Sequence, residues 1–199
     1  MAGTQTSSNA RTITYTTGAD FCRIFKEDMK NLYLRALLLT ADPAKAEQCF
    51  VAGLDDCATG NQVFREWARS WARRAIIKNA VRLMAPEPVY ANGILNTAVS
   101  SGVTDWAWPE LQVEIAAILD LRPFERFAFV MSVFESYSDQ DCALLLGCTR
   151  QTLIAARVRA VQEIARSVAT QGSRRADASL KSQDSVIRLA FPARLATPA

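Results

Sequence analysis

The spacing of apolar residues along the chain predicts helices over most of its length. Between Phe21 and Leu37 the apolar positions recur every three or four residues, which is the period of an amphipathic helix. A second helix is expected to begin at Asp42-Pro43, with Asp as the N-cap and Pro at the first helical position, and to end near Gly60. A third helix is expected over 62–84. No segment shows convincing strand alternation.

The helical period breaks between residues 85 and 109, where Pro, Gly, Ser and Asn accumulate, and we interpret this stretch as a linker. Two helices are then expected over 110–120 and 123–137, followed by two shorter ones, the last fraying from about Gln171. The pattern therefore predicts an all-α fold with two helical modules joined by a flexible linker. The expected divisions are a disordered arm over 1–19, one module over 20–84, the linker over 85–109, the second module over 110–169 and a basic, disordered tail over 170–199.

Two further expectations concern burial. The apolar stripe of the third helix includes Trp67 and Trp71. We expect Trp67 to lie in the core, whereas for Trp71 a core position and an exposed one are equally open. In the helix over 123–137 we expect Phe134 to be buried together with the other apolar residues of its face.

The segment from Ser138 to Thr149 has the features of a helix, a tight turn and the start of a second helix. Ser138 can cap the first helix while Asp141 bonds back to it, Gly147 suits the left-handed residue that ends it, and Thr149 can cap the next. This is a helix-turn-helix pattern, in which the second helix enters the major groove of DNA by its N-terminal end. The predicted contacts to base edges or phosphates are Arg150, Gln151 and Thr152, and the predicted phosphate contacts are Arg157 and Arg159.

Charge is distributed unevenly along the chain. The 199 residues carry 23 Lys and Arg against 20 Asp and Glu, a formal net charge of only +3. Six of these cations and only one anion fall within 64–84, and four cations and one anion within 149–166. Two basic segments of this kind indicate two contact surfaces for a polyanion, although a solvated basic helix face is the ordinary alternative. On the third helix the candidate DNA contacts are Arg69, Trp71, Arg73, Arg74 and Lys78.

Composition argues against an enzyme and against a metal site. The chain has no histidine, which removes Ser–His and Cys–His nucleophiles and zinc sites that need imidazole. Its five cysteines contain no C-x-x-C spacing, so we interpret them as small buried residues in a reducing compartment. We expect no cofactor, no metal and no small-molecule substrate. We find no signal peptide and no membrane-spanning run, which predicts a cytoplasmic protein without membrane insertion.

The chain resembles the extracytoplasmic-function type of bacterial RNA polymerase sigma factor. The segments LRPFERF at 121–127 and YS…LGCT at 137–149 are similar to the family's L-P-x-x-x-R and Y-S-x-x-E-I-A-x-x-L-G-C-S. FREW at 64–67 and WARR at 71–74 resemble the family's F-R-x-W-L…I-A-R-N stretch, which contacts the promoter element that melts. The resemblance spans about 21–166, with both motifs in the family's order.

The resemblance implies a transcription initiation factor that binds RNA polymerase core, at its clamp and flap regions, and promoter DNA. Its first module would bind core and the melted element, and its second the upstream duplex. An anti-sigma factor is a further partner of such proteins. The polymerase contact falls on Glu47, Gln48 and Val51, where the family's acidic D-L-V-Q-E type stretch is replaced by Gln48-Cys49-Phe50-Val51-Ala52. The alternative is a sigma-derived DNA-binding regulator or protein-interaction module that does not initiate transcription.

Overall fold

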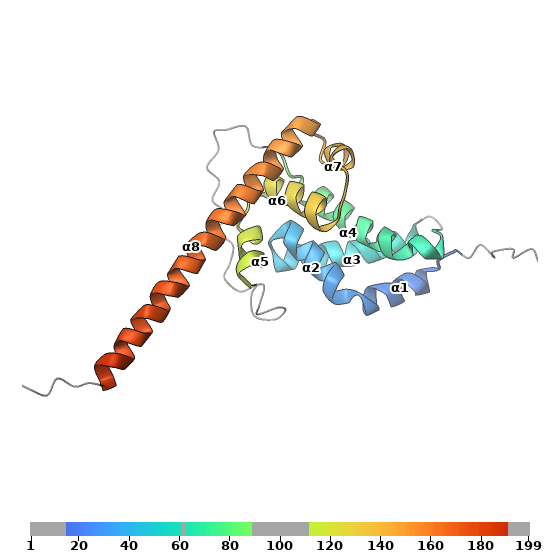
Figure 1. Ribbon diagram of the computed structural model, residues 1–199. Helices are drawn as coiled ribbons and strands as arrows, with labels where there is room; N and C mark the ends of the chain where they lie inside the picture. Colours follow the sequence, from blue (N-terminus) through green and yellow to red (C-terminus); the bar gives the residue numbers. More distant parts are fainter. Residues whose placement is uncertain (1–14, 61–62, 89–111, 191–199) are drawn as a thin grey trace, which may run out of the picture. The chain divides into compact units, whose positions relative to one another are not determined.

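The computed structural model describes residues 15–60, 63–88 and 112–190 (Figure 1). Helices account for nearly all of the regular structure in these ranges. The remainder is one isolated antiparallel bridge, between Tyr15 and Phe64. The all-α prediction is confirmed. No helix of the described ranges is long and apolar enough to cross a membrane.

The chain divides into two compact units, Met1–Glu87 and Pro88–Ala199. Unit 1 contains α1 (Gly18–Glu27), α2 (Met29–Thr40), α3 (Pro43–Thr59), the short 3-10 turn Arg65–Trp67 and α4 (Ala68–Met84). Unit 2 contains α5 (Gln112–Leu119), α6 (Pro123–Phe129), the π-helical turn Val130–Phe134, α7 (Asp139–Leu145) and α8 (Arg150–Ala190).

Unit 1 begins with a well-capped helix, and its first predicted helix is in fact two. Thr17 and Asp20 form a reciprocal capping box at the start of α1. The helix expected across Phe21–Leu37 breaks at Asp28, which leaves helical geometry with φ −107° and ψ 21°. Asp residues favour helix ends because their side chains compete for local backbone groups. Here the Asp28 carboxylate makes no cap hydrogen bond to the α2 backbone and accepts one from the Asn31 side-chain amide. The apolar spacing continues across this break, because α1 and α2 both bury the apolar residues that recur every three or four positions.

The long helices α3 and α4 pack closely against each other. The predicted cap is confirmed, since Asp42 Oδ1 accepts hydrogen bonds from the N–H groups of Ala44 and Lys45 at 2.9 and 3.1 Å. Gly53 lies where the two helices meet: a Cβ at this position would stand 2.8 Å from Ile76 Cδ1. The fully buried side chains of this unit are Phe21, Phe25, Leu32, Leu39, Cys49, Ile76 and Ile77. Because these buried residues define the inner faces of α3 and α4, they also determine which residues of the two helices face outward.

In unit 2, α5, α6 and α7 pack against the first part of α8. Phe127, Met131 and Leu153 are fully buried in this core. Arg126 is buried among them with 3% of its surface exposed, and its guanidinium donates to the carbonyls of Leu119 and Leu121 at 3.1 and 2.8 Å. Those carbonyls belong to the turn between α5 and α6, so Arg126 holds that turn closed.

Three expectations about boundaries and burial differ from the structure. Tyr15 and Thr16 belong to the fold through the bridge to Phe64, so the expected arm over 1–19 is too long at its C-terminal end. The helix expected over 123–137 passes into the π-helical turn, and Ser136 has a positive φ of 54°. That local change rotates Phe134 outward, leaving it 52% exposed rather than buried.

The last helix is also longer than expected. α8 continues to Ala190 instead of fraying from about Gln171, and it extends past the other helices of its unit (Figure 1). Ala, Arg, Gln and Leu, which have high helix propensity, are frequent in this stretch, although Gly172 interrupts them. The two helices expected to complete the unit therefore differ greatly in length.

Candidate nucleic-acid interface

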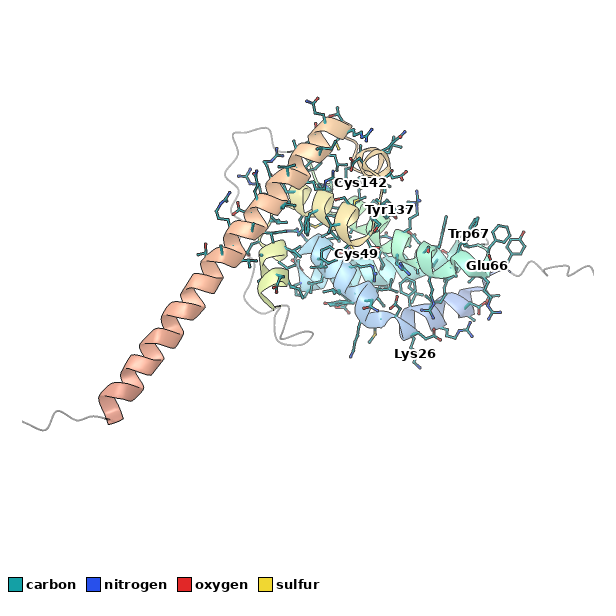
Figure 2. The ribbon with its side chains drawn as sticks, in the orientation of Figure 1. Lys26, Cys49, Glu66, Trp67, Tyr137 and Cys142 are labelled. Carbon is teal, nitrogen blue, oxygen red and sulfur yellow. The ribbon has the colours of Figure 1, made fainter. Side chains whose placement is uncertain are left out.

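Exposed aromatic rings gather where α4 begins. Trp67 is 61% exposed, Trp71 42% and Phe64 37%. The expected burial of Trp67 is wrong, because residues 65–67 form a 3-10 turn and α4 begins only at Ala68. The turn has three residues per helical turn rather than 3.6, which moves Trp67 away from the apolar stripe of α4. Figure 2 shows Trp67 and Glu66 at this end of the helix.

The rings contact one another in order. Phe64 meets Trp67 edge-to-face, with 5.4 Å between ring centroids and an interplanar angle of 88°. Tyr15 stacks on Phe64 at 5.1 Å and 23° and is itself 46% exposed. Tyr15 was missed as a site residue because it falls in the expected arm. The alternation of Thr with Ile13 and Tyr15 over 12–16 is the sequence pattern that could have indicated a short extended pairing.

The predicted cations of α4 divide into free and paired groups. Arg74 and Lys78 are exposed, and no carboxylate of the described residues forms an ion pair with either. Arg69 forms an ion pair with Glu27 at 2.7 Å, and Arg73 is half-buried. Trp71, Arg74 and Lys78 follow at intervals of three and four residues, which places them along one face of α4, and Trp67 lies in the turn that precedes it. This face, defined by these four residues, is the α4 face below.

The turn between α7 and α8 has the predicted caps. Ser138 Oγ accepts a hydrogen bond from the Asp141 N–H at 3.1 Å and donates to the Asp141 carboxylate at 2.7 Å. Gly147 has a φ of +63°, as expected for the residue that ends a helix in left-handed geometry. Thr149 Oγ1 accepts from the Thr152 N–H at 3.1 Å. The first turn of α8 is therefore held in a defined direction relative to α7.

Buried side chains hold α7 on α8. Ala143 and Leu146 of the α7 segment are 7% and 8% exposed, and Leu153 of α8 is fully buried, as the sequence predicts. Cys142 of α7 and Ala156 of α8 are also fully buried. Because this seam uses one side of α8, Arg150 and Gln151 lie on the exposed side, whereas Thr152 is half-buried and its hydroxyl is 2.8 Å from that of Thr149.

The arginines further along α8 are held by carboxylates of their own unit. Arg157 Nη1 donates to Asp139 at 2.6 Å, and Arg159 Nε donates to Glu125 at 2.8 Å. Arg150 is 71% exposed in its side chain and only 3.9 Å from Asp139 at its Nε. Sequence reasoning missed these pairs because the partners lie 18 and 34 residues away along the chain. Because of these ion pairs, carboxylates of the same unit already compensate part of the positive charge of α8.

The residues predicted to contact polymerase share one exposed face of α3. Glu47, Gln48 and Val51 are all exposed, Val51 to 59% of its surface. Their spacing of three and four residues makes them neighbours on the helix surface. The face offers a protein partner one carboxylate, one amide and one apolar side chain.

Four of the thiols are unsuited to nucleophilic chemistry. Burial raises the pKa of the Cys49 thiol to about 11, that of Cys57 to about 12 and that of Cys142 to about 11, and it also raises the pKa of Cys148. A protonated thiol is a weak nucleophile and a weak metal ligand. Cys22 is exposed, so the expectation that all five thiols are buried is wrong for this residue. Within the described ranges, no three His, Cys, Asp or Glu side chains gather as a metal site.

No protein-family model matches the chain, and no curated protein matches it. A functional assignment must therefore be built from the α4 face, the α7–α8 turn and the exposed face of α3.

Proposed function

We propose that this chain is a sigma-type transcription initiation factor that binds RNA polymerase core and directs it to specific promoters in the cytoplasm. The observation that carries the proposal is the α4 face, where Trp67 and Trp71 are 61% and 42% exposed. They adjoin Arg74 and Lys78, which form no ion pair with any carboxylate of the described residues. Exposed aromatic rings beside free cations suit single-stranded nucleic acid, because bases stack on the rings while the cations follow the phosphates.

The α7–α8 pair would act as a helix-turn-helix on duplex DNA. Its exposed Arg150 and Gln151 lie at the start of α8, the end that such a helix presents to base edges. Arg can bond guanine and Gln adenine with two hydrogen bonds each. Arg157 and Arg159, held by Asp139 and Glu125, would contribute to the field along the phosphates. A factor with both surfaces could hold the upstream duplex and the melted strand of one promoter.

The exposed face of α3 would contact the core enzyme. Its apolar centre, Val51, suits a protein partner because exposed apolar side chains gain from burial in an interface. The resemblance to the sigma family rests on the motifs at 64–74 and 121–149. It supports the clamp region of core as the partner of this face, whose position in the chain corresponds to the family's core-binding stretch, and the second unit would approach the flap. An anti-sigma factor could compete for the same face.

The decisive experiment is co-purification of the full chain with RNA polymerase core, followed by transcription from a library of promoters. We expect stoichiometric core subunits and initiation at a defined promoter class. Val51→Arg should weaken the association with core, because it puts a charge in the centre of the contact. Met29→Arg, which changes an exposed apolar residue of α2, is the matched control. No retention of core by the unsubstituted chain would refute the proposal.

One observation favours the second candidate, a sigma-derived regulator that does not initiate transcription. The α3 face carries a single carboxylate, Glu47, where the resembled family has an acidic patch. For such a regulator a gel shift would detect duplex binding without any association with core. Arg150→Ala and Gln151→Ala should then abolish sequence preference, whereas Arg157→Ala should weaken binding to all sequences alike. Equal losses on every sequence for all three variants would reject this division of roles.

A further inference from the structure

We propose that Tyr15 and Phe64 form a stacking platform for an unpaired base of a single-stranded nucleic acid, adjoining the α4 face at Trp67. The inference rests on the proposed function, and it extends that site into a segment that the sequence places in the disordered arm. It assigns binding roles to two residues, and the ligand it requires is a nucleobase that presents its flat face.

The backbone holds the platform in place. The Thr16 N–H donates to the Val63 carbonyl at 2.8 Å, next to the antiparallel bridge between Tyr15 and Phe64. This pairing holds the two rings in a stack, with 5.1 Å between centroids and an interplanar angle of 23°. Since the hydrogen bond uses backbone atoms alone, the tyrosine ring can be changed without removing the pairing.

The rings are stacked and remain partly exposed. Tyr15 is 46% exposed and Phe64 37% exposed, and Trp67, which meets Phe64 in an edge-to-face contact, is 61% exposed. Three aromatic side chains that touch one another and remain open to solvent form a contiguous apolar patch, which proteins rarely leave without a partner. The nearly parallel stack presents flat ring faces, the geometry on which a base stacks.

The neighbouring charges favour a nucleic acid over an apolar protein segment. Arg65, beside Phe64, is exposed and forms an ion pair with Asp20 at 3.6 Å. Arg74 and Lys78, which have no carboxylate partner among the described residues, continue along the adjoining α4 face. From Trp71 to Lys78 this face rises by about 10 Å along the helix axis. An extended strand whose base stacks on Tyr15 and Phe64 would therefore run its phosphates past cations, as in single-strand binding grooves.

The test measures binding of the full chain to a fluorescein-labelled single-stranded oligonucleotide by anisotropy, with the same sequence as duplex in parallel. Tyr15→Ala should weaken single-strand binding by about fivefold or more, the loss that corresponds to one stacked base. Tyr15→Phe keeps the ring and should bind as the unsubstituted chain does. Met29→Ala, on α2, removes an exposed apolar side chain elsewhere in unit 1 and is the matched control. Thermal unfolding of each variant verifies that the fold is retained.

The outcomes separate this inference from the proposed function. If the unsubstituted chain binds single strands and Tyr15→Ala binds as tightly as Met29→Ala, the platform is refuted while the function of the α4 face stands. If Tyr15→Ala loses association with core polymerase but not with the oligonucleotide, the rings serve a protein contact and the inference is also refuted. If the unsubstituted chain binds no single strand at all, the proposed role of the α4 face fails and the platform fails with it.

Discussion

Gly147 ends α7 with a φ of +63°, and apart from its chain neighbours no residue has an atom within 4 Å of the place where a Cβ would stand. A substitution there changes backbone strain and leaves packing alone. Gly147→Ala should therefore lower the free energy of unfolding by about 1 kcal/mol, the usual cost of left-handed geometry for a residue with a Cβ. Urea unfolding followed by circular dichroism measures it. Gly147→Asn should lose less, because Asn tolerates this region better, and an alanine variant as stable as the parent would contradict the assigned conformation.

A second residue-scale prediction concerns the buried Arg126. Burial lowers the pKa of its guanidinium to about 10, so it remains charged at neutral pH, and it donates to the carbonyls of Leu119 and Leu121. Arg126→Ala leaves both acceptors without this donor and opens a cavity, which should lower the free energy of unfolding by about 3 kcal/mol. Arg122→Ala, an exposed neighbour, should change it by less than about 0.5 kcal/mol. Similar losses in both variants would reject the role of Arg126.

Single residues were predictable from sequence where the cause is local. Asp42, Ser138, Gly147 and Thr149 take the expected cap positions because a cap depends on atoms two or three residues away. The predicted burial of Trp67 was wrong because the position of this side chain depends on the 3-10 turn before α4. Over so few residues a 3-10 turn and an α-helix have similar apolar patterns.

At the scale of elements, the sequence predicts the helices better than their ends. The break at Asp28 preserves the apolar period, so periodicity alone joins α1 and α2. The π-helical turn after α6 inserts one residue per turn and exposes Phe134, an effect that no pattern of 3.6 residues contains. The sequence does not indicate the extension of α8 to Ala190 through its apolar spacing, because the stretch is largely polar and only its helix propensity favours a helix.

The buried thiols of α3, Cys49 and Cys57, give the prediction at this scale, which concerns stability at alkaline pH. Burial raises the pKa of Cys49 to about 11 and that of Cys57 to about 12, from an ordinary value of 9.0. A thiol whose pKa is higher in the folded state holds its proton more tightly there. Its contribution is therefore fully present below pH 9 and is lost as the pH rises toward 11 and 12. Urea unfolding at pH 7, 8.5 and 10 should show stability falling over the upper interval.

The matched variants identify the thiols as the cause. The double variant Cys49→Ala, Cys57→Ala should be less stable at pH 7 because it removes buried atoms, but its stability should fall less between pH 8.5 and 10. Cys22→Ala, which removes an exposed thiol, serves as the control and should keep the parent's profile. Parallel profiles for the double variant and the parent would show that other groups set the alkaline limit.

At the scale of the whole molecule, the sequence predicts where charge accumulates but not which charges are free. The basic segments over 64–84 and 149–166 are visible in the sequence, and the all-α architecture follows from the periodicity. The pairs Arg69–Glu27, Arg157–Asp139 and Arg159–Glu125 join residues far apart in the chain, so only the fold reveals them. The candidate site therefore has fewer uncompensated cations than the sequence suggests.

This division of free and paired cations predicts how salt affects binding to a single-stranded oligonucleotide. The logarithm of the affinity falls linearly with the logarithm of the salt concentration, with a slope of about −0.7 for each phosphate that a cation neutralises. Arg74 and Lys78 lack carboxylate partners among the described residues, so Arg74→Ala with Lys78→Ala should reduce the magnitude of the slope by about 1.4. Glu27→Gln with Arg69→Gln removes an existing ion pair at constant net charge and should leave the slope unchanged. The slope is measured by anisotropy between 50 and 300 mM salt, on the order of the range over which such dependence is usually followed. Equal reductions in both double variants would mean that the paired cations also neutralise phosphates, and that the α4 face is not the main track of the strand.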